Sequence, residues 1–192
     1  MRNWHTIDYL QTGTPRQQAA YAALQQLGIL GTLAAYGPVL AGTLPLAVDV
    51  AGSDLDLICQ ASAAQLPGFG ELLRSQYGAL PGFELHHTRW QEQPTVVCRF
   101  HAAGFDWEVF AQPLPARQQQ ALRHLHVEHA VLQAGGEAWR RAVQQLKQQG
   151  LKTEPAFAQL LGLSGDPYAA LLALEAWPAE MLRAYVAARP LP

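Results

Sequence analysis

Residues 50–59 read VAGSDLDLIC, an apolar run that is interrupted by two carboxylates, Asp54 and Asp56. The run predicts a buried strand, and because successive strand side chains point to opposite faces, the two carboxylates would share one face. Neighbouring carboxylates repel each other and are costly to desolvate unless a positive charge lies between them. Magnesium prefers oxygen ligands of this kind, so the pattern indicates a catalytic or metal site. A solvent-facing pair on a half-exposed strand is the simpler alternative.

Two further acidic positions come from a predicted hairpin. Residues 83–90 and 95–101 alternate in character, and a turn follows before residues 105–111, FDWEVFA. In that last strand Asp106 and Glu108 would share one face, with the apolar side chains on the other. The hairpin therefore supplies a third carboxylate, and a fourth, for the same sheet.

The rest of the chain predicts helices around this sheet. Residues 15–27 have helical spacing after a capping Thr14, and residues 61–77 form a second helix that the sequence Pro67-Gly68 breaks or delays. From residue 116 onward the pattern is mostly helical, with helices predicted over residues 117–134 and 137–149. We expect an α+β fold with a mixed sheet flanked by helices. The predicted domains are an α/β core over residues 1–113 and a packed helical extension over residues 114–192.

Composition narrows the class of protein. The formal net charge of −2 argues against bulk electrostatic binding to nucleic acid. No apolar segment reaches transmembrane length, and the start MRNWHTIDYL has no signal-peptide pattern. Cys59 and Cys98 lie in apolar runs, which is typical of buried free thiols in a reducing compartment. We expect a cytoplasmic protein with no membrane partner.

The acidic strands follow a Gly-Thr turn, and this order resembles the nucleotidyltransferase superfamily of the DNA polymerase beta type. The likeness rests on residues 40–43 (LAGT), 53–57 (SDLDL) and 107–109 (WEV). The chain also resembles a bacterial family of unknown function that carries segments similar to GTLPL, GSDLDLIC, GLKTEPAFA and GDPY. That second resemblance implies no established activity.

The first resemblance implies a site. Catalytic and metal ligands would be Asp54, Asp56 and Glu108, holding Mg²⁺ or Mn²⁺. Such ions stabilise the attacking and leaving oxygens of phosphoryl transfer. The nucleotide-binding residues would be Gly42, Thr43, Ser53 and Lys152. Gly42 would let the backbone approach a phosphate, and Thr43 would offer a hydroxyl and an N–H.

The sequence departs from this pattern in the spacer 44–52, LPLAVDVAG, which holds no Arg or Lys. A basic group for the phosphates would then come from Arg89, Arg99 or Lys152. Lys152 lies at a helix junction, where a side chain can be aimed into a cleft.

Three functions therefore stay open. The first is a magnesium-dependent nucleotidyltransferase that uses a nucleoside triphosphate and a small-molecule, protein or RNA acceptor. The second is a non-catalytic member of the same fold that binds a nucleotide or a partner. The third is a metal-dependent phosphohydrolase or a transition-metal site built on histidines. These are His124, His126 and His129 of the predicted helix that starts at Arg117, together with His86 and His87. In that helix Glu128 is interpreted as a partner of Arg123 or a solvated side chain.

Overall fold

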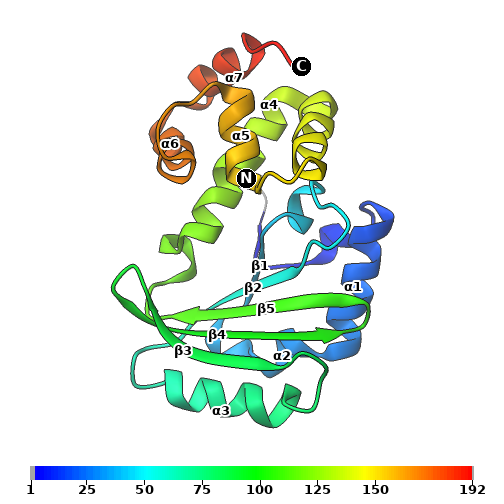
Figure 1. Ribbon diagram of the computed structural model, residues 1–192, viewed down its shortest axis with the longest axis vertical. Helices are drawn as coiled ribbons and strands as arrows, with labels where there is room; N and C mark the ends of the chain where they lie inside the picture. Colours follow the sequence, from blue (N-terminus) through cyan, green and yellow to red (C-terminus); the bar gives the residue numbers. More distant parts are fainter. Residues whose placement is uncertain (1–2, 192) are drawn as a thin grey trace. The chain divides into compact units, whose positions relative to one another are not determined.

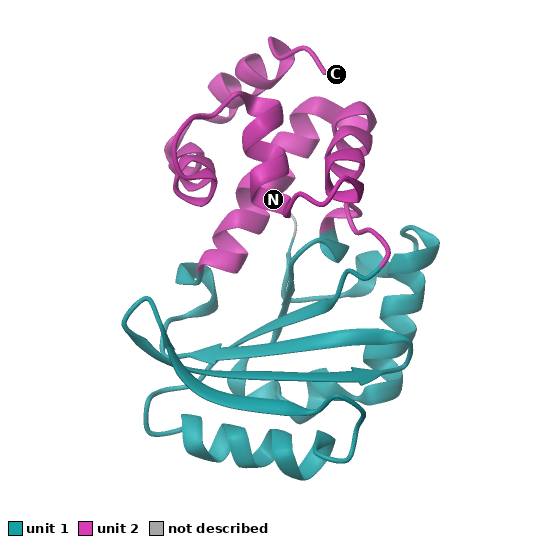
Figure 2. Ribbon diagram, viewed as in Figure 1, with its two compact units in different colours: residues 1–45, 52–119 teal, residues 46–51, 120–192 magenta. Residues whose placement is uncertain are grey.

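The computed structural model describes residues 3–191, which fall into two compact units (Figure 2). One unit comprises residues 1–45 and 52–119, and the other comprises residues 46–51 and 120–192. The predicted extension covered residues 114–192, whereas the second unit begins at residue 120 and also includes the short segment 46–51.

The first unit is built on a five-stranded mixed sheet (Figure 1) with the order β1-β2-β5-β4-β3. Strand β1 pairs antiparallel with β2, β2 pairs parallel with β5, and β5-β4-β3 form an antiparallel meander. The strands are β1 (Val39–Ala41), β2 (Leu55–Gln60), β3 (Glu84–Trp90), β4 (Gln93–Ala102) and β5 (Phe105–Gln112).

One face of this sheet is apolar and belongs to the core. Leu57, Val109 and Cys98 are neighbours across β2, β5 and β4, and each is fully buried. Side chains of the helices of this unit share that core. Its helices are α1 (Pro15–Leu27), α2 (Ile29–Thr32) and α3 (Leu66–Tyr77).

Local signals set the ends of these elements. The Thr14 side chain accepts from the Gln17 N–H and the Gln17 side chain accepts from the Thr14 N–H, a capping box that starts α1. Pro67 lies in the first turn of α3, so the helix begins at Leu66 and not at residue 61. Gly52 adopts a left-handed φ of +84° in a turn, so β2 begins only at Leu55. The predicted strand 50–59 is therefore too long at its start.

The second unit is helical. Its helices are α4 (Gln120–Gln148), α5 (Thr153–Leu161), α6 (Pro167–Ala173) and α7 (Ala179–Ala187). Gly136 interrupts α4 with φ 67° and ψ −156°, which separates the two predicted helices. Asp166 caps α6 by accepting from a backbone N–H at 2.8 Å.

Short 3₁₀ turns occur in both units: Asp8–Leu10, Ala34–Tyr36, Leu44–Leu46, Ala116–Gln118 and Leu174–Ala176.

Among the described residues, the helices are all too short or too polar to cross a membrane.

Candidate functional site

Two of the predicted carboxylates are neighbours in the sheet. Asp56 in β2 pairs in register with Glu108 in the parallel strand β5. Paired residues on adjacent strands project from the same face, and their strands are about 4.8 Å apart. Both side chains are half-buried. The face opposite the apolar core therefore carries two adjacent acids near the middle of the sheet.

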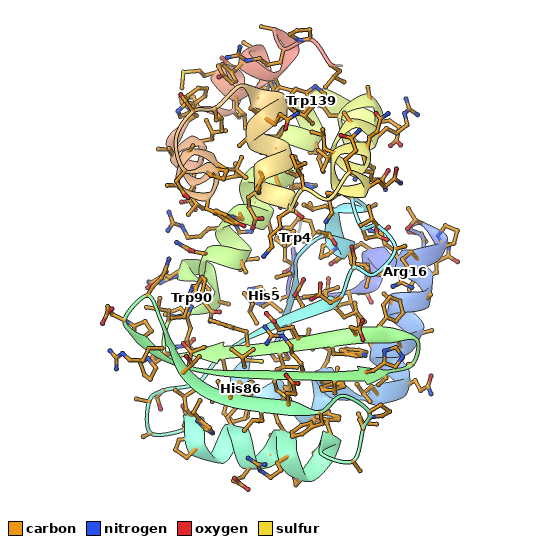
Figure 3. All side chains as sticks on the ribbon, in the orientation of Figure 1. Trp4, His5, Arg16, His86, Trp90 and Trp139 are labelled. Carbon is orange, nitrogen blue, oxygen red and sulfur yellow. The ribbon has the colours of Figure 1, made fainter. Side chains whose placement is uncertain are left out.

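Asp54 lies just outside β2, two residues before Asp56, and is also half-buried. The preceding residue, Ser53, is held by a guanidinium, because Arg16 Nη2 donates to the Ser53 carbonyl at 3.4 Å. The same guanidinium carbon lies 4.0 Å from the centroid of the Phe105 ring. Arg16, which Figure 3 labels, is the second residue of α1. Sequence reasoning missed it, because nothing in the distant acidic motif points to a basic residue 37 positions earlier.

The Gly42 turn lies directly against one of the acids. Gly42 has a left-handed φ of +72°, and a Cβ placed on it would lie 2.0 Å from Asp56 Oδ2. A side chain at this position would collide with the carboxylate, so both the backbone angle and the contact require glycine. The hydroxyl of the next residue, Thr43, is covered and has no hydrogen-bond partner among the described residues. A buried donor that stays unpaired is costly, which marks the turn as a place for a missing acceptor.

Glu108 has a basic neighbour on its other side. Arg99 in β4 pairs in register with Glu108, and Arg99 Nη2 forms an ion pair with Glu108 Oε2. The Arg99 side chain is 54% exposed and that of Glu108 is 27% exposed. The alternation along residues 95–101 is the sequence signal for the position of Arg99, which lies on the same face of the sheet as Glu108. Arg89, by contrast, pairs with Glu92 beside the β3–β4 turn.

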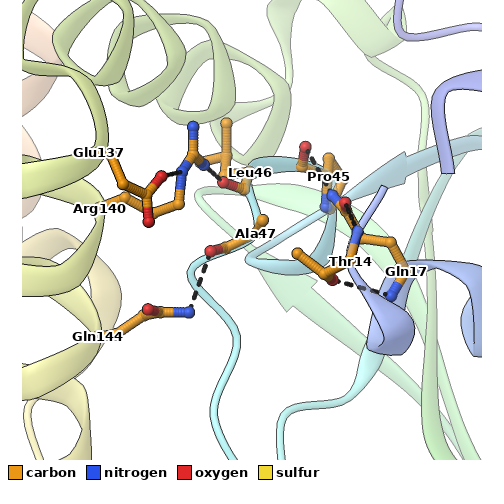
Figure 4. A network of polar contacts seen from close by, with 8 residues as sticks. All are labelled: Thr14, Gln17, Pro45, Leu46, Ala47, Glu137, Arg140 and Gln144. Carbon is orange, nitrogen blue, oxygen red and sulfur yellow. Dashed lines mark hydrogen bonds and ion pairs between the residues drawn. The ribbon is translucent and has the colours of Figure 1, made fainter. Parts of the chain in front are cut away.

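The spacer after the Gly-Thr turn serves packing, which explains its lack of basic residues. Leu44, Leu46 and Val48 are at most 2% exposed. Within the first unit, Gln17 Nε2 donates to the carbonyl of Leu44 at 2.7 Å. The same nitrogen donates to the carbonyl of Pro45 at 3.4 Å (Figure 4). The segment therefore does not have the open form of a phosphate-binding loop.

Within the second unit, helix α4 holds the remainder of this segment. Arg140 donates to the carbonyl of Leu46, and Gln144 donates to that of Ala47 at 3.1 Å (Figure 4). Residues 46–51 thus belong to the helical unit, although the rest of that unit begins only at residue 120.

Lys152 is exposed at the residue that precedes α5. It belongs to the second unit, and its role in nucleotide binding stays a prediction.

The predicted histidine site is not assembled on β3. His86 and His87 are consecutive in the strand and point to opposite faces. His87 lies against α3, since a Cβ on Gly70 would be 3.1 Å from its Nε2, whereas His86 Nε2 lies 3.6 Å from Glu84 Oε2. These two side chains cannot bind one ion together.

The interpretation of Glu128 is also wrong. Its side chain is not solvated, since the residue is 3% exposed. It does not pair with Arg123 either, because Arg123 binds Glu175 through Nε at 2.9 Å and Nη2 at 2.6 Å.

A cavity lies at the other end of β2, away from the acids. Its volume is about 570 Å³, and its lining includes His5, Tyr36, Gln60 and Arg117. None of the predicted site residues lines it. Asp54 and Asp56 lie at the start of β2, whereas Gln60 ends the strand.

Solved structures share this fold at low identity. The Cid1 poly(U) polymerase bound to MgGTP has a TM-score of 0.52 and 14% identity, with 80% of this chain and 47% of that chain covered. A Cid1 structure described through its RNA terminal uridylyl transferase activity has a TM-score of 0.54, 13% identity and coverages of 83% and 48%. The polymerase core of TRAMP, an RNA surveillance complex, has a TM-score of 0.50, 11% identity and coverages of 94% and 59%.

The chain thus spans about half the length of the Cid1 chains that it matches. The predicted α+β fold, a nucleotidyltransferase-like mixed sheet with C-terminal helices, is confirmed by this likeness. No curated protein matches the sequence. The model of one family, described as a domain of unknown function (DUF4269), matches residues 22–174, which is most of the chain, and the protein belongs to that family.

Proposed function

We propose that this protein is a magnesium- or manganese-dependent nucleotidyltransferase that uses a nucleoside triphosphate. The observation that carries the proposal is the row formed by the Gly42 turn, Asp56 and Glu108. The Asp56 carboxylate lies against the backbone of Gly42, and Glu108 is the register partner of Asp56 on the next strand. The superfamily fold supports the same conclusion.

The residues present fit a hard divalent cation. Asp54, Asp56 and Glu108 offer carboxylate oxygens, which are the ligands that magnesium and manganese take. The Gly42 backbone lies directly against the Asp56 carboxylate, and the covered Thr43 hydroxyl has no hydrogen-bond partner among the described residues. Such an ion supplies charge neutralisation at the phosphates and at the attacking oxygen.

The chain's own groups can bind and orient the phosphates. The backbone of the Gly42-Thr43 turn can approach a phosphate closely, and the Thr43 hydroxyl can donate to it. Arg99 and Arg16 replace the basic group that the spacer lacks. A guanidinium matches phosphate oxygens through two parallel N–H donors. Phosphate binding by Arg99 would release the Glu108 carboxylate, which could then accept the proton of an acceptor hydroxyl.

One observation favours the second function, a non-catalytic nucleotide- or partner-binding protein. Glu108 is tied to Arg99 in an ion pair, which leaves it less available as a ligand or a base. Among the described residues, the ligand atoms of Asp54, Asp56 and Glu108 do not gather as closely as those of a group in the helical unit, which lie within 4.8 Å of one another. The two functions differ in whether the Arg99–Glu108 pair opens when nucleotide binds.

An RNA 3′ end is the acceptor to test first, because the solved structures that share the fold are described as poly(U) polymerase and RNA terminal uridylyl transferase. A small molecule or a protein hydroxyl is the alternative. The protein would be incubated with each α-³²P-labelled nucleoside triphosphate, Mg²⁺ or Mn²⁺, and RNA oligonucleotides, a metabolite extract or no acceptor. We expect label in a product and release of pyrophosphate.

The matched variants are Asp56→Asn, which removes a ligand, and Asp8→Asn, which changes an exposed acid at the edge of a 3₁₀ turn. Activity should fall at least about 100-fold in the first variant and stay unchanged in the second. Nucleotide binding without any transfer would favour the non-catalytic function. Transfer that survives Asp56→Asn would refute the assignment of the site.

A further inference from the structure

The helical unit holds a second group of polar side chains, which the proposed function does not use. His124 and Glu128 are one turn apart in α4, and Glu154 lies in the first turn of α5. One ligand atom from each of the three lies within 4.8 Å of those of the other two. His124 Nδ1 is 3.2 Å from Glu154 Oε1.

This group is buried and incompletely paired. His124 is 4% exposed and Glu128 is 3% exposed. His124 Nε2 and Glu128 Oε1 are both covered and have no hydrogen-bond partner among the described residues. Buried polar atoms are almost always paired, and two orphan atoms in one cluster point to a missing partner.

Glu128 lies in a setting that disfavours its negative charge. Burial raises the pKa of the Glu128 carboxyl well above its usual range, and the neighbouring charge of Glu154 adds to the effect. Lys147 opposes it electrostatically, but its ammonium donates to the Thr153 hydroxyl at 2.8 Å. A bound cation beside the Glu128 and Glu154 carboxylates would offset the repulsion between them.

We propose that His124, Glu128 and Glu154 bind a divalent transition-metal ion that ties α4 to α5. An imidazole nitrogen with two carboxylates suits Zn²⁺ or a similar first-row ion, whereas magnesium and calcium prefer oxygen ligands alone. Three protein ligands leave one tetrahedral position for water. The Glu154 side chain is 25% exposed, which gives the ion a way in.

The ion would stabilise the contact between α4 and α5. The two helices are joined by a loop at Gly150 and Leu151, and the ligands come from both sides of it. Binding to the folded form and not to the unfolded chain raises the melting temperature, by about 5–10 °C when the free ion exceeds its Kd a hundredfold. This site is independent of the acids on β2 and β5, so either site can fail without the other.

The test uses the chelator-treated protein, residues 1–192, in an Asp54→Asn/Asp56→Asn background, which removes the strand carboxylates as competing ligands. Zn²⁺ is titrated by calorimetry, the bound metal is counted by mass spectrometry after dialysis, and melting is followed with Zn²⁺ and with Mg²⁺. We expect one Zn²⁺ per chain and a rise in melting temperature with Zn²⁺ but not with Mg²⁺.

Three further substitutions are made in that background. Glu128→Gln and Glu154→Gln should each weaken Zn²⁺ binding about 100-fold or more, while Glu180→Gln, an exposed glutamate of α7, should leave it unchanged. Circular dichroism checks the fold of each variant. If the variant at the buried Glu128 fails to fold, the Zn²⁺ affinity of the Glu154→Gln variant, at a partly exposed position, decides the test. The proposal is overturned if the background binds no stoichiometric Zn²⁺, or if a folded variant at Glu128 or Glu154 retains wild-type affinity.

Discussion

Replacement of Gly42 by alanine tests the geometry of the acidic site most specifically. The substitution adds one methyl group, which would lie 2.0 Å from Asp56 Oδ2 and 2.9 Å from its carboxyl carbon. Ordinary van der Waals contact begins near 3.4 Å, so either the turn or the carboxylate has to move. The substitution also forces a non-glycine residue to hold a φ of +72°.

The two costs can be separated. A left-handed backbone costs about 1–2 kcal/mol for a residue with a side chain. Overpacking against a neighbour that cannot yield adds about 1–3 kcal/mol. Gly52 provides the control, because it has a φ of +84° and nothing within 4 Å of the added Cβ. Gly52→Ala should therefore cost about 1–2 kcal/mol and Gly42→Ala about 2–5 kcal/mol of unfolding free energy.

Urea unfolding of both variants, followed by tryptophan fluorescence, gives the two free energies. The melting temperature of each variant is also measured with and without about 10 mM Mg²⁺, which is a large excess over the protein. Gly42→Ala should lose the magnesium response because Asp56 is displaced, and Gly52→Ala should keep it. Equal destabilisation of the two variants together with an intact magnesium response in Gly42→Ala would refute the reasoning.

Three other predictions follow from separate features. Asp54→Asn/Asp56→Asn should stabilise the metal-free protein by about 1 kcal/mol, because the repulsion between two carboxylates disappears, and should abolish the rise in melting temperature with Mg²⁺; an unchanged rise would place the ion elsewhere. Burial raises the pKa of the Cys59 and Cys98 thiols to about 12. Native protein should therefore react slowly with a thiol reagent between about pH 7 and 9, the range around the pKa of a free thiol, whereas urea-unfolded protein should react faster as the pH rises. Fast labelling of the native protein would contradict the burial. Asp166→Ala removes the cap of α6 and should cost about 1 kcal/mol in urea unfolding, and Asp166→Asn should cost less; equal losses would show that the cap is not the cause.

The sheet could be predicted because its signals are local. Period-two alternation in residues 105–111 separates Asp106 and Glu108 from Trp107, and the strand has that pattern of burial. The end of α1 at Gly28 and the break of α4 at Gly136 were readable for the same reason, since glycine provides the left-handed angles that both positions adopt.

Contacts between distant segments could not be predicted. The start of β2 at Leu55 depends on the turn at Gly52, which an apolar run hides. The assignment of residues 46–51 to the helical unit depends on Arg140 and Gln144, which come more than 90 positions later. Sequence spacing carries no information on such pairings.

The candidate site was predictable only in part. The alternation of Asp54, Asp56 and Glu108 identified the acidic face, and the register of β2 and β5 places the last two side by side. Arg16 reaches the Ser53 carbonyl through the fold alone. Glu128 was misread because a glutamate in a polar stretch of helix is normally solvated. The packing of other helices of its unit on α4 makes it 3% exposed.

Paramagnetic broadening by Mn²⁺ in a two-dimensional amide spectrum tests the central claim most directly, because it shows where the ion binds. In the presence of a non-hydrolysable nucleoside triphosphate, sub-stoichiometric Mn²⁺ should broaden the amides of Gly42, Thr43, Asp56 and Glu108 in the wild-type protein. The same amides should stay sharp in Asp54→Asn/Asp56→Asn. Sharp signals at these four residues in the wild-type protein, at Mn²⁺ concentrations that broaden other parts of the chain, would contradict the account.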